Sequence, residues 1–247
     1  MTHFEQHRRH IPVILAILFA LSGCKSRHAE TESETISEKK PVTATPEKKP
    51  EKKQEEAAPP PRPVKSAGDP KAYEKETITY SVKLETSKGD VIIDVYDKLA
   101  PLAAERFKTL VEAKFYDEAV FFRVINGFVA QAGIAADPKI NAKWRSERMK
   151  DDPVIQSNIK GSVSFASAGP NSRTTQFFIN YKHNGNLDGM GFAPFGIVRD
   201  MGPVEQFYNE YSRGRGPSQP LIQQQGNTYL KKEFPKLDYI KKATIIK

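Results

Sequence analysis

The chain has 247 residues, a net charge of +8, one cysteine and 5 histidines, of which only His183 lies beyond His28. This composition excludes an internal disulfide and a cysteine-based zinc site, and it argues against a histidine metal cluster or a Ser-His-Asp triad. Because lysine and arginine are interspersed with aspartate and glutamate, the charge favours a solvated surface over a nucleic-acid partner.

Residues 1–23 have the features of a signal peptide. Arg8 and Arg9 precede an apolar stretch of about eleven residues, which is short of the roughly 20 that a membrane-spanning helix needs. The stretch ends in LSGC, which resembles a bacterial lipobox and implies cleavage before Cys24 and lipidation of its thiol. The alternative is an ordinary signal peptide, with Cys24 incidental. For a Gram-negative lipoprotein, Lys25 after the cysteine favours anchoring in the cell envelope at the periplasmic face of the outer membrane.

Residues 24–76 are dominated by Lys, Glu, Pro, Ser, Thr and Ala, and no aromatic residue appears among them before Tyr73. Such a composition buries too little apolar area to offset the entropy of ordering. We therefore predict a disordered tether after the lipidated cysteine. A spacer that crosses peptidoglycan, or a partner motif, is the alternative.

Residues 77–247 have the pattern of one mostly β domain. Apolar residues alternate over 80–84 and 91–95 around the sequence SKGD, which predicts a hairpin. Pro101 then begins a helix with an apolar face, and a second helix is expected near Pro203. Further strands are expected at 119–125, 128–131, 162–166, 176–181, 192–198 and near the end of the chain. Many short strands with two helices indicate a barrel that is capped at its ends.

The most informative segment is FFRVINGFVAQAG, residues 121–133. It places Arg123 and Gln131 inside an apolar run that reads as two short strands and a turn. Burying a cation or an amide without partners costs several kcal/mol, so a core strand gains nothing from either residue. We therefore expect both side chains to serve a site outside the core.

Three segments together resemble the cyclophilin family. FFRVINGFVAQAG is similar to the family's FHRVI-x-GF-x-x-QGG stretch, GSVSFASAGPNSRTTQFFIN (161–180) to its second signature, and LDGMGFAPFGIV (187–198) to its third. The resemblance covers residues 78–247, and the three segments follow one another in the same order as in the family. It implies an eight-stranded antiparallel barrel with a helix at each open end, and peptidyl-prolyl cis-trans isomerase activity on proline-containing polypeptides.

The chemistry of this reaction suits the residue types. The X–Pro bond resists rotation with a barrier near 20 kcal/mol, and no bond is broken, so no nucleophile, metal or cofactor is expected. A donor aimed at the prolyl nitrogen and a dry pocket for the ring suffice, if their contacts strengthen in the transition state.

The resemblance also implies the roles of individual residues. Arg123 is the donor to the prolyl nitrogen, and Gln131 orients it and binds the substrate backbone. The proline pocket is implied to be lined by Phe128, Val129, Phe178 and Leu187. The residues before the proline are implied to contact Ala166, Ser167 and Gln176. Phe122 and Phe177, on the opposite strand face, are expected to belong to the core.

The chain also departs from the best-known family members. Asn186 stands where they carry tryptophan, the loop after LDG lacks their histidine, and Val129 replaces a methionine. These departures keep one alternative open, a proline-binding scaffold or holdase with little turnover. A separate alternative is a cell-envelope structural protein in which the tether is the functional part. Residues 213–230 are expected to pack over the barrel, with a binding surface as the alternative. A monomer is expected.

Overall fold

A computed structural model describes residues 72–214 and 216–246. The predicted signal peptide, Cys24 and residues 25–71 of the predicted tether lie outside the described residues. Within the described part, none of the helices combines the length and apolarity that crossing a bilayer requires.

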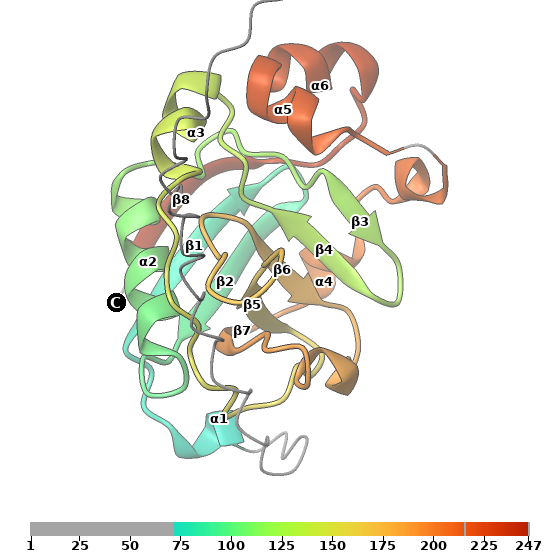
Figure 1. Cartoon of the computed structure of the whole chain (residues 1–247). Coiled ribbons are helices and arrows are strands. Elements are labelled where there is room, and N and C mark those ends of the chain that lie inside the picture. The colour runs from blue at the N-terminus through green and yellow to red at the C-terminus, as the bar shows by residue number, and fades with distance from the viewer. Residues whose placement is uncertain (1–71, 215, 247) are drawn as a thin grey trace, which may run out of the picture. The chain divides into compact units, whose positions relative to one another are not determined.

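Eight strands form one antiparallel sheet in the order β3-β4-β6-β5-β7-β2-β1-β8 (Figure 1). Their bounds are β1 Tyr80–Thr86, β2 Gly89–Val95, β3 Arg123–Ile125, β4 Val129–Ala132, β5 Ser162–Phe165, β6 Phe177–Asn180, β7 Pro194–Val198 and β8 Ile240–Ile246. An isolated antiparallel bridge between Val120 and Tyr239 joins the segments that precede the two outer strands. The Phe121 N–H donates there to the Asp238 carbonyl at 2.9 Å, and the sheet closes on itself. The predicted eight-stranded antiparallel barrel is confirmed.

The two faces of the sheet carry different side chains because successive residues of a strand point to opposite faces. Ala130, Phe177 and Ile179 belong to the main core, whereas Val129 and Phe178 belong to a separate apolar cluster. All four residues of β4 and of β6 are buried, so both faces of these strands are covered. Phe177 is in the core, as predicted.

The helix α2 (Pro101–Glu112) lies along one side of the barrel and starts at the predicted proline (Figure 1). Its buried face centres on Phe107, whose ring lies 5.0–6.5 Å from four other aromatic rings, those of Tyr116, Phe165, Phe177 and Phe195. Such ring pairs add to the stabilisation that burial itself provides.

The second predicted helix is shorter than expected. The helix α4 spans only Gly202–Glu205, and a separate 3-10 turn, η2, follows at Glu210–Arg213. The chain leaves the helical path because Phe207 packs on Phe121, with ring centroids 4.3 Å apart, and because the Tyr208 N–H donates to Asp238. These tertiary contacts outweigh the helical spacing of the apolar residues.

Besides a four-residue helix at the start of the described part, three further α-helices were not predicted: α3 (Pro138–Trp144), α5 (Gln219–Gln225) and α6 (Asn227–Glu233). Figure 1 shows α5 and α6 together beyond β3 and β4, near α3. Their buried residues Ile222 and Leu230 form a small apolar cluster with Val120, Phe122 and Ile134. The segment after Arg213 therefore packs over the barrel as expected, but Phe122 lies in this outer cluster and not in the main core.

The described part begins with a short helix, α1 (Ala72–Lys75). Tyr73 is 4% exposed and packs with Tyr96 and Leu99, its ring 5.3 Å from that of Tyr96. Packing therefore extends N-terminal to the predicted domain boundary at Thr77.

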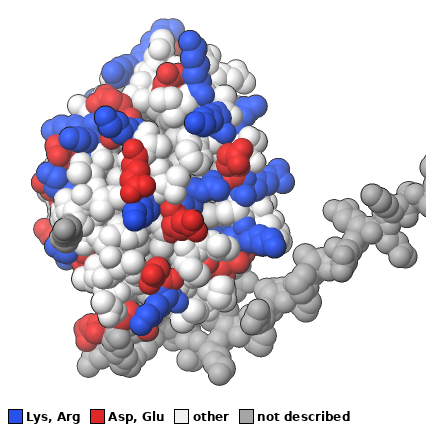
Figure 2. Space-filling view, turned by 90° about the vertical axis from the view of Figure 1, so that its left-hand side faces the viewer, with Lys and Arg blue, Asp and Glu red and all other residues white. Residues whose placement is uncertain are grey.

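Charged side chains of both signs are interspersed on the face shown in Figure 2. No continuous basic strip crosses the described residues on this face. The pattern matches the solvated surface expected from the sequence.

A buried cation links the AGPN loop to the start of α2. Arg173 is 1% exposed and donates to Asp151 at 3.0 Å, to Asp152 at 3.1 Å and to the Lys150 carbonyl. Asp152 also accepts the Leu102 and Ala103 N–H groups at 3.0 and 2.9 Å, which caps α2 from 50 residues away. The sequence GPN forms the predicted turn, with Asn171 at φ +52°.

We predict that Arg173→Met lowers the free energy of unfolding by about 3–5 kcal/mol, because it leaves the buried Asp152 carboxylate without its cation. Urea denaturation of the part of the chain that begins at residue 72 measures this. The matched control is Arg213→Met, which removes an exposed ion pair with Glu210 and should cost about 1 kcal/mol or less. An equal loss of unfolding free energy in the two variants would show that the buried ion pair contributes no more to stability than the exposed one.

Candidate active site

Arg123 and Gln131 face each other across the first strand pair of the sheet. They are register partners in β3 and β4, so both side chains stand on the same face. The Arg123 Nη1 donates to Gln131 Oε1 at 3.1 Å. The structure thus brings together the two polar residues that the sequence singled out.

This hydrogen bond is the first of a chain of three. Gln131 Nε2 donates to Gln176 Oε1 at 2.9 Å, and Gln176 Nε2 donates to Gln219 Oε1 at 3.1 Å. Each amide accepts on its oxygen and donates through its nitrogen, so the orientation of one fixes that of the next. The result is a glutamine relay, Gln131–Gln176–Gln219, that ends on the Arg123 guanidinium.

The guanidinium keeps most of its donors available. Among the described residues Arg123 pairs with no carboxylate, and the bond to Gln131 uses one of its five N–H groups. Its Cζ lies 5.6 Å from the centroid of the Phe128 ring. Partial burial lowers the pKa of Arg123, yet an arginine remains protonated at any physiological pH. The site therefore offers a fixed cation with free donors.

An apolar cluster contains Phe128 and so adjoins the guanidinium. Val129, Phe178 and Leu187 are 2–5% exposed, and partly buried side chains of Phe128, Ala166 and Phe192 pack on them. Phe178 and Phe192 meet edge to face with centroids 5.5 Å apart. This cluster, which we call the apolar notch, unites five of the residues predicted to line the site.

Ser167 is the predicted site residue that joins neither the glutamine relay nor the apolar notch. Its hydroxyl donates to the Gly169 carbonyl at 3.1 Å, within its own turn. The Ala166 N–H is likewise used internally, by the Gln176 carbonyl at 2.8 Å. A peptide that hydrogen-bonds to the backbone of Ala166 would therefore have to bind the Ala166 carbonyl.

Two site residues were missed from the sequence. Phe192 is an apolar residue shortly after the LDG motif, and its position could have suggested a place in the notch. Gln219 lies beyond the three family-like segments, and no local pattern distinguishes it from its glutamine neighbours. Only the packing of α5 against the barrel reveals it.

A buried polar network binds the backbone of Phe128 and Phe192, the two partly buried rings that form the rim of the apolar notch. Asp188 accepts the Asn158 N–H and side-chain amide at 2.9 and 2.7 Å, and Asn158 Nδ2 also donates to the Phe192 carbonyl at 2.8 Å. Asn184 Nδ2 donates to the Phe128 carbonyl at 3.0 Å. The Asp of LDG therefore has a structural role: it fixes the backbone on which the aromatic rim is mounted.

The rim also shows the departures from the best-known family members. Asn186 is exposed, and Met190 is 65% exposed. Trp144 packs at the main core, its ring 6.4 Å from that of Phe115, and is not part of the notch. The tryptophan absent from the rim is therefore not replaced by the one elsewhere in the chain.

Comparison with known proteins decides the family. The model for cyclophilin type peptidyl-prolyl cis-trans isomerase/CLD matches residues 81–221. The chain belongs to the cyclophilin family. The match begins at Ser81 and does not concern the segment before it.

Relatives of this cyclophilin support the enzyme class. Peptidyl-prolyl cis-trans isomerase-like 3 of Rattus norvegicus is 36% identical over 126 residues, which cover 49% of this chain and 76% of that protein. Peptidyl-prolyl cis-trans isomerase CYP18-1 of Arabidopsis thaliana is 34% identical over 126 residues, 48% and 75% of the two chains. The predicted class, a cyclophilin-type peptidyl-prolyl cis-trans isomerase, is confirmed.

Solved structures agree on the fold. A cyclophilin type peptidyl-prolyl cis-trans isomerase of Cryptosporidium parvum superposes with a TM-score of 0.52 at 23% identity, covering 68% of this chain and 98% of that one. A second structure of that protein, determined in the presence of the dipeptide Ala-Pro, gives 0.51 at 24% identity.

We predict that Gln219→Ala lowers kcat/KM for an X–Pro peptide about five-fold, because loss of one neutral hydrogen bond of about 1 kcal/mol loosens the glutamine relay. Exchange NMR measures the rate. Gln219→Glu keeps the acceptor oxygen and should retain activity, and Gln224→Ala, exposed on the same helix, is the matched control. Equal rates for all three variants would show that the relay ends at Gln176.

Proposed function

We propose that this cyclophilin accelerates rotation about X–Pro bonds in exported or cell-envelope proteins, with Arg123 as the group that acts on the prolyl nitrogen. The observation that carries the proposal is the pairing of a fixed guanidinium with an adjoining apolar notch. The Cryptosporidium parvum structure with Ala-Pro supports a proline-containing peptide as the ligand.

The proline ring enters the notch and contacts Val129, Phe178 and Leu187. Arg123 donates an N–H to the prolyl nitrogen as the amide twists and the nitrogen becomes pyramidal. The nitrogen lone pair is delocalised in the planar ground state and localised in the twisted state. The hydrogen bond therefore strengthens only on the way to the transition state, which lowers the barrier without tightening substrate binding equally.

Gln131 keeps the guanidinium in place during this change. Its Oε1 holds one N–H of Arg123, and the rest of the relay keeps the amide from turning. A donor that is already oriented loses little energy to reorganisation, which is the main advantage of a built site over water.

We predict that Arg123→Ala lowers the rate of isomerisation about 100-fold, by analogy with loss of one preorganised donor. Arg123→Lys should recover little, since an ammonium lacks the planar fork that serves Gln131 and substrate together. Exchange NMR on a proline peptide gives the rate, and circular dichroism checks the fold.

The control for this experiment is Arg213→Ala, which removes an arginine whose side chain is 71% exposed. If the wild-type protein binds the peptide but leaves the interconversion rate unchanged, the protein is a proline-binding scaffold instead. That second function is favoured by the exposed Asn186 and Met190, because Asn186 stands where the best-known family members carry a tryptophan beside the proline pocket.

The lipid anchor at Cys24 and a monomeric state belong to the same proposal. LSGC and the apolar stretch before it support cleavage and acylation, and Lys25 supports the outer membrane over the inner one. A tethered isomerase would then meet its clients as they emerge at the periplasmic face.

We predict that the full chain, expressed in a Gram-negative host, incorporates labelled palmitate and fractionates with the outer membrane. Cys24→Ala should abolish the label, because the thiol that would carry the acyl chain is gone. Lys25→Asp is the matched variant: it should keep the label but shift the protein to the inner membrane. A label that survives in Cys24→Ala would refute the anchor.

A further inference from the structure

The turn between β3 and β4 contains an Asn-Gly pair, Asn126 and Gly127. Both residues are exposed, and Figure 1 shows the turn on the side of the domain opposite α2. The Phe128 N–H donates to the Ile125 carbonyl at 2.9 Å and Gly127 has φ +69°, which together indicate a type II turn. The pair therefore lies at the tip of the hairpin whose first strand carries Arg123.

An asparagine that precedes glycine is chemically the least durable asparagine of a chain. The backbone nitrogen of the glycine attacks the asparagine Cγ and closes a succinimide ring, while Nδ2 leaves as ammonia with the proton of that nitrogen. Water then opens the ring at one of its two carbonyls and gives aspartate or isoaspartate, so a water is consumed and an ammonia released. Glycine favours the attack because no Cβ shields its nitrogen.

Within the described residues, nothing holds the side chain of Asn126. It forms no hydrogen bond there, and the Gly127 N–H donates to no group in residues 72–214 and 216–246. A Cβ added at Gly127 would meet no atom within 4 Å apart from its neighbours in the chain. The attacking nitrogen and the amide that it attacks are therefore both free to approach each other.

The sequence contains a second Asn-Gly pair, which serves as an internal comparison. Asn184 precedes Gly185 and is 2% exposed. Its Nδ2 donates to the Phe128 carbonyl at 3.0 Å and to Asn180 Oδ1 at 2.7 Å. Turning its Cγ toward the next backbone nitrogen would break two buried hydrogen bonds, which is costly. The same dipeptide is thus held in one place and open to reaction in the other.

We propose that Asn126 is a site of spontaneous deamidation, and that the isoaspartate formed there moves Arg123 away from the apolar notch. An isoaspartyl linkage adds one methylene to the backbone between the two strands, about 1.5 Å of chain. The consequence for catalysis rests on the proposed function, whereas the modification itself does not depend on it.

The added length has to be taken up by β3. On the other side of the turn, the Phe128 carbonyl is held by Asn184 Nδ2 at 3.0 Å and by the Tyr181 N–H at 2.9 Å. The strand β4 also pairs with β6, whereas β3 is the last strand in the sheet order and has three residues. A displacement of β3 changes the pairing of Arg123 with Gln131. A shift of about 1 Å in a positioned group can lower a rate about 100-fold.

The test follows the purified full chain during incubation at physiological temperature and mildly alkaline pH. Peptide mapping by mass spectrometry locates the replacement of an amide NH2 by OH, and labelling with isoaspartyl methyltransferase counts the isoaspartate. We expect Asn126 to convert about ten-fold faster than Asn184 or more, because two buried hydrogen bonds hold the latter. The isomerisation rate from exchange NMR should fall as isoaspartate accumulates, to about a tenth of its starting value or less at full conversion.

Two variants separate the lengthened backbone from other causes of decay. Asn126→Gln keeps an amide but would need a larger ring to react, so its isomerisation rate should stay constant through the incubation. Asn126→Asp, measured fresh, has the new carboxylate without the added methylene. Its rate should stay within about five-fold of that of the fresh wild type, as expected for an exposed charge.

The proposal is overturned if Asn126 keeps its amide throughout an incubation that deamidates a urea-unfolded sample, or if Asn184 converts as fast. It is also overturned if the rate stays constant while isoaspartate accumulates, or if Asn126→Gln decays as the wild type does. A fresh Asn126→Asp variant as slow as the aged protein would contradict the role of the added methylene. If the fresh wild type shows no isomerisation, the proposed function fails, and mass spectrometry still decides the modification.

Discussion

The cross-strand pairing of Arg123 with Gln131 is the constraint on which the site depends. The β3–β4 register places both side chains on the outer face, while Ala130 between Val129 and Gln131 faces the core. A slip of one residue would turn the arginine into the barrel, where a cation without partners is not tolerated. The core thus enforces the position of the functional group: the same alternation that turns Ala130 and Phe177 into the main core places Gln131 and Phe178 on the opposite face, beside Arg123.

The apolar notch needs polar support for a similar reason. Rings such as Phe128 and Phe192 lie on loops, which do not hold a fixed position by packing alone. Asn158 and Asn184 donate to the Phe192 and Phe128 carbonyls at 2.8 and 3.0 Å. Asp188 in turn accepts the Asn158 side-chain amide at 2.7 Å. Because every broken bond there would leave a buried group unpaired, the network resists distortion. The network thus supports two aromatic residues that lie outside regular secondary structure.

Much of this arrangement was predictable from the sequence, and the exceptions have physical causes. Strand alternation and the family-like segments identified the barrel, Arg123, Gln131 and most of the notch, because these depend on local order. The length of α4 was wrong because Phe207 and Tyr208 make contacts with residues far away in the chain. The helix α3 was missed although Asp137 and Pro138 form a recognisable start, with Asp137 Oδ1 accepting the Lys139 N–H at 2.8 Å. Gln219 had no local signal, since its role arises only from docking.

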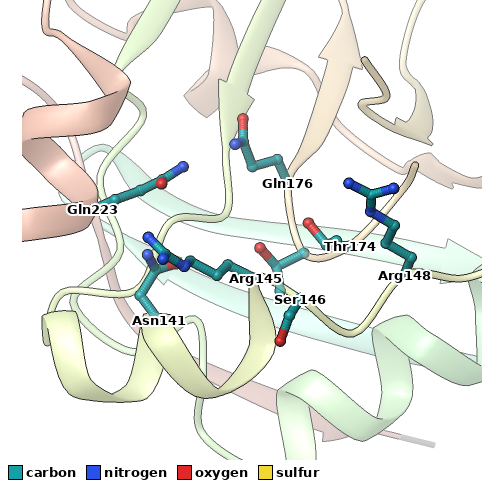
Figure 3. Close-up of a pocket in the computed structure, with 8 residues that line it drawn as sticks. Asn141, Arg145, Ser146, Arg148, Thr174, Gln176 and Gln223 are labelled. Carbon is teal, nitrogen blue, oxygen red and sulfur yellow. The ribbon is translucent and has the colours of Figure 1, made fainter. Parts of the chain in front are cut away.

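That docking depends on one backbone position. Gly226, between α5 and α6, has φ +56°, and a Cβ placed there would lie 2.0 Å from the Ala136 carbonyl oxygen. The Asn227 N–H donates to the same carbonyl at 3.1 Å, so the turn is fastened to the loop that leads into α3. Any side chain at this position would force α5 away from α3. Gln219 would then separate from Gln176 in the glutamine relay. Gln223 would leave the wall of a pocket of about 510 Å³ that it forms with Gln176 and with residues of α3 (Figure 3). One glycine therefore couples the positioning of Arg123 to the shape of the neighbouring pocket, although it contacts neither.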